Sequence, residues 1–517
     1  MHSIPFVTLS VWTPVLFGVA VRCAGSDGRP TLTRMLALVG ALAGLVATMP
    51  LLFEFDTQAP AMQFVENRPW LATLGMSWRV GVDGVSLWMV VLTALTTLLI
   101  VGASWQAVTT RVAQYFGAVL ILSGLMVGVF VSLDGMLFFV FFESTLIPLY
   151  LLIGAWGGKH RSYAAVKFFF MSFAGSLLLL AAMLYLFGLS HTFDMHVWHE
   201  MKLDLVPQLL IFCGFLAAFA VKLPMWPVHG WLKDAYAEGP IGAAIMLGMV
   251  KIGGYGFLRF MLPIAPDASR MLAPAMIALS LFTVIYASLI ALVQTELSAL
   301  LAYSTIAHMG LVTLGLFLFN QLAVEGAIVQ MISYGLVSGA LLICTGMLYE
   351  RTQTRSLDAL GGVANVMPRY ATLAVLFSMA NLGLPGTSGF IGEFLVIMGA
   401  IKANFWIGGA AALTLVLGAA YTLRGVRRVI FGAVKNERVA RLTDLGRRER
   451  ALLVPLAVIV LGLGVAPRYF IATLEQTTSA VVQDSMRSKL TETSHLGERT
   501  AVRQGTAILR PFRGKRA

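Results

Sequence analysis

Long runs of apolar residues, rather than alternating apolar and polar positions, dominate this chain. Many runs exceed the roughly 20 residues that an α-helix needs to cross a bilayer core of about 30 Å, whereas the strands of a membrane β-barrel would alternate with period two. The pattern predicts an all-α polytopic membrane protein with about fourteen transmembrane helices. Their expected ranges are 4–21, 32–53, 82–102, 113–131, 134–154, 166–188, 206–225, 240–262, 270–293, 297–319, 323–348, 372–400, 404–426 and 451–472.

Composition and charge narrow the functional class. Only 12% of the residues are charged, against about 25% in a soluble chain, which excludes a soluble enzyme. The formal net charge is +12, but the Lys and Arg residues fall in predicted loops and in the tail, where membrane topology uses them, so we expect no nucleic-acid partner. Cys23, Cys213 and Cys344 lie far apart, whereas an iron–sulfur cluster needs four thiolates. We therefore expect no cofactor or metal in this chain.

The basic residues of the loops predict the orientation. Twenty follow odd-numbered predicted helices and five follow even-numbered ones. By the positive-inside rule, the odd loops lie in the cytoplasm, and both termini lie outside it. The first apolar run has no basic residue before it and Arg22 behind it, the reverse of a secretory signal, so we expect it to be retained as a helix of an inner-membrane protein.

Two Leu-Pro dipeptides point to an internal repeat. Pro224 lies near the end of the seventh predicted helix and Pro385 in the middle of the twelfth, 161 residues apart. Paired, proline-interrupted helices are typical of transporters built from inverted repeats. Five helices in each half, an odd number, would give the halves opposite orientations. The predicted division is an N-terminal unit 1–112, repeats at 113–262 and 270–426, a basic loop with helix fourteen at 427–472, and a flexible polar tail at 473–517.

A few charged side chains remain inside the apolar runs. A charge at the bilayer centre costs on the order of 2.5–3.5 kcal/mol, so several of them together indicate function. Glu143 is followed by Pro148, which prevents the normal hydrogen bond to the carbonyl of Ser144 and favours water there. Lys222 stands directly before Leu-Pro. We interpret Glu143 and Lys222 as an acid–base pair whose separation changes its affinity for protons, and Arg259 as a residue that reaches the interface.

The remaining intramembrane groups extend this line of proton carriers. Lys251 lies among small residues and is interpreted as a relay base. His308 is the one histidine at its depth, which argues against a haem, and leaves a relay role or a core residue. Glu393 lies eight residues beyond Pro385. Asp134 begins the fifth predicted helix, either as an N-cap or as an entrance group.

Five segments of the chain carry distinctive motifs: FESTLIPLYLLIGAWGG (142–158), VKLPMWPVHGWL (221–232), GGYGFLR (253–259), AYSTIAHMG (302–310) and NLGLPGTSGFIGEF (381–394). With these motifs, the chain resembles the antiporter-like subunits of proton-pumping NADH:quinone oxidoreductase (complex I), and above all its chain M. The resemblance extends to about residue 470. It implies fourteen helices, two inverted five-helix repeats, broken helices seven and twelve, and a polar axis in the membrane plane.

The resemblance also implies roles and partners. Glu143 and Lys222 would be the coupling pair, Lys251 the central lysine and Glu393 the outlet glutamate. The partners would be the lipid bilayer, protons and the other membrane subunits of complex I, and NADH, FMN, iron–sulfur clusters and quinone would be bound by partner subunits. The chain would thus be the ion-pumping subunit of a translocase, without a redox centre of its own.

This sequence departs from the family pattern at several positions. The usual Leu-Pro-Asp-Ala-His is replaced by residues 232–236, which end in Tyr236; 239–241 are Gly-Pro-Ile in place of Ala-Pro-Thr, and 298–299 are Ser-Ala in place of a basic pair. Tyr334 stands where a histidine is usual, and we expect its hydroxyl to bridge Lys251 or His308 to Glu393, unless it only fills core volume. Three hypotheses follow: a proton-translocating subunit, a subunit of a cation/proton antiporter or membrane hydrogenase, and a scaffold whose relay has decayed.

Overall fold

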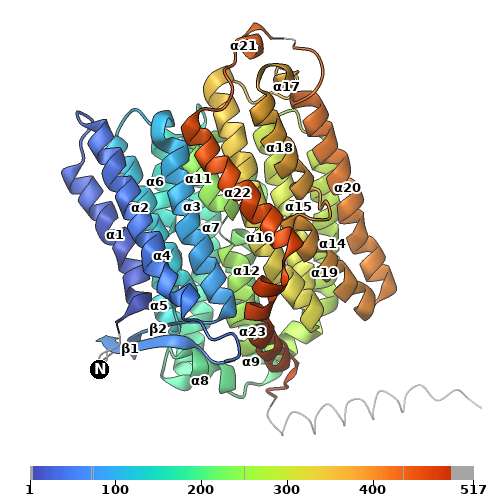
Figure 1. Cartoon of the computed structure of the whole chain (residues 1–517). Helices are drawn as coiled ribbons and strands as arrows, with labels where there is room; N and C mark the ends of the chain where they lie inside the picture. The colour runs from blue at the N-terminus through green and yellow to red at the C-terminus, as the bar shows by residue number, and fades with distance from the viewer. Residues whose placement is uncertain (1–3, 72, 74, 250, 435, 491–517) are drawn as a thin grey trace, which may run out of the picture.

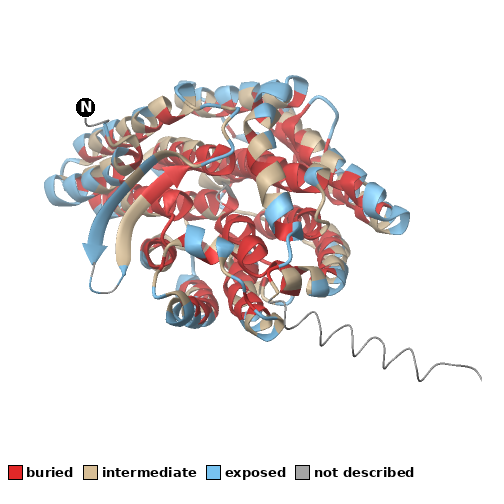
Figure 2. Cartoon of the chain, turned by 90° about the horizontal axis from the view of Figure 1, so that it is seen from below, coloured by how far each residue is buried: buried red, intermediate tan, exposed pale blue. Residues whose placement is uncertain are grey.

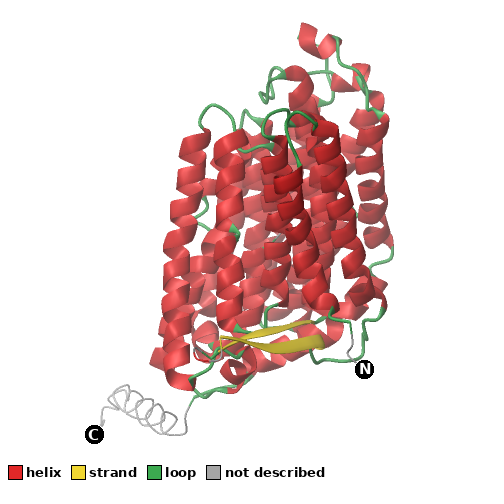
Figure 3. Ribbon diagram, turned by 90° about the vertical axis from the view of Figure 1, so that its left-hand side faces the viewer, coloured by secondary structure: helices red, strands yellow, loops and turns green. Residues whose placement is uncertain are grey.

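Near-parallel helices make up most of the computed structural model, with a two-stranded β-hairpin at the end of the bundle where the N-terminus lies (Figures 1 and 3). The structure describes residues 4–71, 73, 75–249, 251–434 and 436–490. Its elements are α1 (Phe6–Ala24), α2 (Pro30–Phe53), β1 (Gln63–Leu71), β2 (Met76–Val82), α3 (Gly84–Ala107), α4 (Val112–Val131), α5 (Gly135–Ser144), α6 (Leu146–Trp156), α7 (Arg161–Ser190), α8 (Met195–Glu200), α9 (Leu205–Lys222), α10 (Gly230–Glu238), α11 (Ile241–Met249), α12 (Ile252–Gly256), the π-helix η2 (Phe257–Met261), α13 (Leu262–Ile264), α14 (Pro266–Val293), α15 (Leu297–Phe317), α16 (Gln321–Thr352), α17 (Val363–Val366), α18 (Pro368–Asn381), α19 (Ser388–Ala403), α20 (Phe405–Val429), α21 (Glu437–Ala440), α22 (Arg447–Val465) and α23 (Arg468–Met486).

Within the described residues, twelve helices are long and apolar enough to cross a membrane, or thirteen if α22 and α23, which meet at a bend of 68°, count as one span. The difference from about fourteen arises mainly at 372–400, which is not one helix. Pro385 lacks a backbone N–H, and Gly383 and Gly386 adopt left-handed backbone angles of φ +77° and +91°, so the chain turns between α18 and α19. The chain is also non-helical between Lys222 and Gly230, around Pro224.

The helices differ sharply in how far they are enclosed by protein (Figure 2). In its most apolar window, α16 is entirely buried and α15 is 94% buried, whereas α1 and α20 are only 33% buried and expose large apolar side chains. A buried helix can carry polar side chains that would be costly against lipid. The enclosed helices α15 and α16 therefore position the polar groups of the candidate site.

The β-hairpin and helix α23 are among the elements that the sequence did not predict. Strands β1 and β2 pair antiparallel, with Glu66 opposite Val80 and Arg68 opposite Trp78; their mixed charged residues gave no apolar run. Helix α23 continues to Met486, so the prediction of a flexible tail from residue 473 is wrong for 473–486. This segment is helical because apolar and small side chains, including Leu474, recur on one face that packs on the bundle. Residues 491–517 of the predicted tail lie outside the described residues.

The segment after α23 forms hydrogen bonds with residues of α8 and α14. The backbone N–H of Lys489 donates to Asp267 (2.9 Å), and its ammonium donates to the carbonyl of Trp198 (3.1 Å). Burial lowers the pKa of Lys489 to about 8; Arg487 acts in the same direction, and Asp484 and Asp267 oppose the shift. The positive charge of Lys489 therefore destabilises the attachment of this segment, because burial favours the neutral amine.

Candidate functional site

Glu143 and Lys222 lie near one another at two helix ends. Glu143 is in the last turn of α5, half-buried, and its Oε2 is buried without a hydrogen-bond partner among the described residues. Lys222 ends α9 because Pro224 disfavours a further helical turn. Its ammonium lies 5.1 Å from the centre of the Phe142 ring and 5.6 Å from that of Phe168. The charges of Glu143 and Lys222 interact, but these two described side chains form no direct ion pair.

Lys251 lies at a break between two helices. It precedes α12 with a non-helical backbone (φ −107°, ψ 59°) and is 3% exposed. Its ammonium donates to the carbonyl oxygen of Gly248 and lies 5.5 Å from the centre of the Tyr334 ring. The same carbonyl accepts from the hydroxyl of Ser338 (3.1 Å). The helix break therefore places a lysine amine and a hydroxyl on one backbone acceptor in the protein core.

His308 and Glu393 form a buried pair at the meeting point of α15, α16 and α19. Nδ1 of His308 lies 3.1 Å from Oε1 of Glu393, and both side chains are almost inaccessible. The amide of Gln330 lies 3.2 Å from the same Nδ1 and donates to Glu393 (3.4 Å). Gly392 allows α19 to approach this closely, because a Cβ there would lie 2.6 Å from the backbone nitrogen of Gln330. The pair is a candidate donor and acceptor of a proton.

Tyr334 joins the central lysine to this pair. Its ring lies against the ring of His308, with centroids 4.3 Å apart, and the ammonium of Lys251 lies 5.5 Å from the centre of the Tyr334 ring. Its hydroxyl donates to Oγ of Ser304 (3.1 Å) and Oγ1 of Thr305 (3.3 Å). The structure thus places Tyr334 between Lys251 and His308, in contact with both.

A second tyrosine completes the network and was missed from the sequence. The hydroxyl of Tyr421, from α20, lies 3.3 Å from Nε2 of His308 and 3.0 Å from Oγ of Ser304. Asn381 also donates to Ser304 (3.2 Å). A polar residue within an apolar run indicates a candidate site residue, and Gln330 and Asn381 could have been found in this way. Tyr421 could not, because tyrosine is equally common as an amphipathic packing residue.

The structure also shows the contacts of two further charged candidates, Asp134 and Arg259. Asp134 accepts from the backbone N–H groups of residues 136 and 137 at 3.0 Å each, so the N-cap alternative holds. Arg259 has a partner that the sequence did not predict. It is 7% exposed and pairs with Asp83, and its Nε donates to the hydroxyl of Tyr255 (3.1 Å). A buried acidic partner, distant in the sequence, removes the need for water at the guanidinium.

The predicted residues therefore form two groups. Glu143 and Lys222 make one, and Lys251, Tyr334, His308 and Glu393 make the other, where side-chain contacts and shared hydroxyls run without interruption from the lysine to the glutamate. Hydroxyl and imidazole groups both donate and accept hydrogen bonds. Such a series can pass protons through a region that excludes bulk water.

Comparison with known proteins identifies the family. The family described as NADH:quinone oxidoreductase/Mrp antiporter, TM, matches residues 132–418. NADH-quinone oxidoreductase subunit M of Rhodobacter capsulatus is 43% identical over 468 residues, which are 87% of this chain and 90% of that subunit. The chain belongs to the subunit M family of NADH:quinone oxidoreductases. It is a multi-pass membrane subunit of a respiratory oxidoreductase complex, and its partners are membrane subunits of that complex.

Solved structures agree with this assignment. A chain of respiratory complex I from Thermus thermophilus with bound NADH superposes with a TM-score of 0.86 at 30% identity, covering 93% of this chain and all of that one. The predicted all-α polytopic architecture and the function of an antiporter-like complex I subunit are thereby confirmed. A chain of the Mrp complex from a Dietzia species has a TM-score of 0.81 at 21% identity. The superposition covers 94% of the chain described here and all of the Mrp chain, which shows a shared fold. The inverted repeat and the domain boundaries stay predictions.

Proposed function

We propose that this subunit transfers protons across the inner membrane along Glu143, Lys222, Lys251, the Tyr334–His308 contact and Glu393. The observation that carries the proposal is the unbroken set of side-chain contacts from Lys251 to Glu393 inside helices enclosed by protein. In this proposal, the chain is the pumping part of a translocase. NADH, FMN, iron–sulfur clusters and quinone belong to partner subunits, and both termini lie outside the cytoplasm.

Electrostatics supplies the coupling in this mechanism. When Glu143 is close to Lys222, the two charges largely compensate each other. When a partner subunit draws the carboxylate away, the lysine charge is felt by the next group along the axis. Like charges about 10 Å apart repel by roughly 1.7 kcal/mol at an effective dielectric constant near 20, more than a tenfold change in a proton equilibrium. A proton on Lys251 would then move toward Tyr334, His308 and Glu393.

Two substitutions at the first pair test the proposal. We expect Glu143→Ala and Lys222→Ala each to remove most proton pumping, because either change leaves the other charge without its counter-charge. Glu143→Asp keeps the carboxylate on a shorter stem and should retain part of the activity. Proton uptake by vesicles containing the reconstituted complex measures this. Normal pumping by both alanine variants, in normally assembled complexes, would contradict the relay.

The shared fold with the Mrp complex chain keeps a cation/proton antiporter as the second candidate. Purification of the intact assembly from membranes separates the two. Quinone-reducing and iron–sulfur subunits should co-purify with this chain if it is part of an NADH:quinone oxidoreductase. Small membrane subunits alone would favour the antiporter assembly. Normal activity of a complex lacking every charge of the axis would favour the scaffold.

A further inference from the structure

A basic hollow of about 710 Å³ lies where α20 ends, at the end of the bundle opposite the β-hairpin (Figure 1). Its walls are the last turns of α20, the residues that follow this helix and the loop between α16 and α17. Four of its lining residues are charged: Asp358, Arg424, Arg427 and Arg428. The volume is within the range of about 300–1,000 Å³ that is usual for ligand pockets. This end of the bundle is the one that the basic loops predict to be cytoplasmic.

The chain supplies little negative charge to these arginines. Arg428 lies 3.4 Å from Asp358, whose side chain is 69% exposed, so water weakens the pair. Arg424 donates to a neutral acceptor, the backbone carbonyl of Leu292. Arg427 is exposed and has no ion-pair partner among the described residues. Three cations against one anion leave the hollow with a formal charge of +2.

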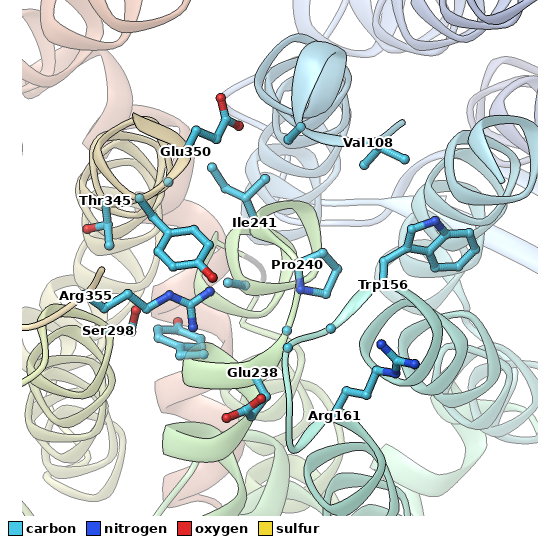
Figure 4. A pocket seen from close by; sticks show the side chains of 18 of the residues that line it. Val108, Trp156, Arg161, Glu238, Pro240, Ile241, Ser298, Thr345, Glu350 and Arg355 are labelled. Carbon is cyan, nitrogen blue, oxygen red and sulfur yellow. The ribbon is translucent and has the colours of Figure 1, made fainter. Parts of the chain in front are cut away.

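A second cavity shows that such an imbalance is not general. In the cavity of Figure 4, at the same end of the bundle, two arginines are matched by two glutamates. The basic hollow also concentrates like charges, because Arg424 stands three and four positions before Arg427 and Arg428, a spacing at which equal charges destabilise a helix. A single basic residue would be enough to interact with the C-terminal end of the helix dipole. The excess of cations therefore indicates an anion from outside the chain.

An exposed apolar face of α20 leads into the hollow. Only 33% of the most apolar window of this helix is buried. Exposed positions recur three and four residues apart, at Leu413, Val416, Ala420, Leu423 and Arg427, and this spacing places them on one face of the helix. Val416 is 65% exposed, and Leu423, which lines the hollow, is 48% exposed. One helix face thus passes from apolar side chains directly to an unpaired arginine.

The arginines lie at the depth of lipid phosphates. Helix α20 is one of those apolar enough to cross a membrane, and it begins at Phe405. At about 1.5 Å per residue, Arg424 lies about 28 Å and Arg427 about 33 Å along the helix from that end. The hydrocarbon core of a bilayer is about 30 Å thick. A helix that crosses the core from Phe405 therefore brings these guanidinium groups to the opposite layer of headgroups.

We propose that the basic hollow binds the headgroup of an anionic phospholipid, whose acyl chains lie along Leu423 and Val416 on α20. Guanidinium groups bind phosphate oxygens through two parallel hydrogen bonds, and basic pockets on the cytoplasmic side of membrane helices hold anionic headgroups. The formal charge of +2 matches the two phosphodiesters of a diphosphatidylglycerol, whereas a phosphatidylglycerol carries one. The lipid site is independent of the proton relay, because it lies outside the enclosed helices that hold the relay residues.

Photo-cross-linking of the complete complex tests this site. Phe431 lines the hollow and is 52% exposed, so p-azidophenylalanine in its place reports on what occupies the hollow. The complex is reconstituted in phosphatidylcholine vesicles that contain a minor fraction of diphosphatidylglycerol, and mass spectrometry identifies the adduct after illumination. We expect the adduct to contain diphosphatidylglycerol at least fivefold above its share of the bilayer.

Arg427→Gln should lower this enrichment about fivefold, because one basic residue near the membrane surface contributes about that factor to the binding of anionic lipid. Arg427→Lys keeps the charge and should retain most of the enrichment. The matched control is Arg441→Gln, which removes another exposed arginine of the cytoplasmic loop that does not line the hollow and lies 3.8 Å from Glu437. It should leave the enrichment unchanged. The amount of assembled complex on native gels should be normal in all three variants, because both side chains are exposed.

Four results would overturn the proposal. Adducts at the bulk ratio of the two lipids would show that the hollow does not select an anionic headgroup, and adducts with another subunit would show that protein covers it. Equal enrichment of phosphatidylglycerol, in vesicles that contain it instead, would refute the match to two phosphodiesters. Loss of the enrichment in inorganic phosphate, but not in chloride of the same ionic strength, would assign the hollow to free phosphate rather than to a lipid.

Discussion

Replacing Tyr334 with phenylalanine removes one hydroxyl from the middle of the polar network and leaves the aromatic ring in place. The hydroxyl donates to Ser304 and, at a longer distance, to Thr305. Hydrogen bonds between membrane helices are worth about 0.6 kcal/mol on average, so the two contacts together contribute about 1 kcal/mol. Neither acceptor is left without a partner, because Ser304 still accepts from Asn381 and Thr305 still donates to the carbonyl of Leu301. We therefore expect normal assembly.

Proton transfer should be affected much more than stability. The contacts of Tyr334 with Lys251 and His308 are made by its ring, which neither donates nor accepts a proton and stays in the variant. The hydroxyl connects Tyr334 to His308 through Ser304 and Tyr421. We therefore expect its removal to lower proton uptake about tenfold, with a loss of about 1 kcal/mol in stability. The assay is proton uptake by vesicles, normalised to the amount of assembled complex. The reasoning is refuted if the phenylalanine variant pumps as fast as the parent, since the hydroxyl would then not be in the path.

Two further predictions concern packing and the C-terminal attachment. Gly392→Ala should destabilise the subunit by about 1–3 kcal/mol, because its Cβ would meet the backbone of α16. The control is Gly188→Ala on α7, which should have no such cost because no described atom lies within 4 Å of the added Cβ. Thermal unfolding of the purified complex measures both variants. The attachment at Lys489, whose pKa of about 8 lies below the ordinary 10.5, should be weakest below pH 8 and strengthen up to about pH 10.5, by at most about 3 kcal/mol. The Leu203 amide donates to the carbonyl of Lys489 (3.1 Å) and reports on the attachment. Its protection from hydrogen exchange, corrected for the intrinsic rate, should rise between pH 8 and about pH 10.5. In Lys489→Met, the protection of this amide should not rise with pH.

Much of the fold could be predicted because the bilayer imposes a length and a composition on each helix. The apolar run at 372–400 predicts one helix, because hydropathy averages over a short turn, although Pro385 indicates the interruption. The short strands and α23 were missed for a related reason, because their polar residues give no apolar run. The sequence shows where an apolar run ends, but an amphipathic helix that lies on the bundle becomes apparent only when its contact surface is known.

The site residues divide in the same way. Charged residues such as Lys251 and Glu393 are evident in the sequence, because a charge inside an apolar run is costly. The sequence did not predict the direct contact between His308 and Glu393, which depends on the close approach of α19 to α16. It also did not predict the partner of Arg259, because the counter-charge, Asp83, is 176 residues away in the sequence. Partners that come together only by folding are beyond what residue type and spacing can predict.

The most direct test of the central claim is the number of protons pumped per pair of electrons in vesicles that contain the complete complex with Lys251→Ala in this subunit. The amine of Lys251 contacts the network leading to Glu393 through the Tyr334 ring, so the relay predicts a lower proton-to-electron ratio or a parallel loss of pumping and quinone reduction, with the assembled complex present in normal amount. An unchanged ratio at an unchanged rate of NADH oxidation would contradict the claim that protons cross the membrane along this axis.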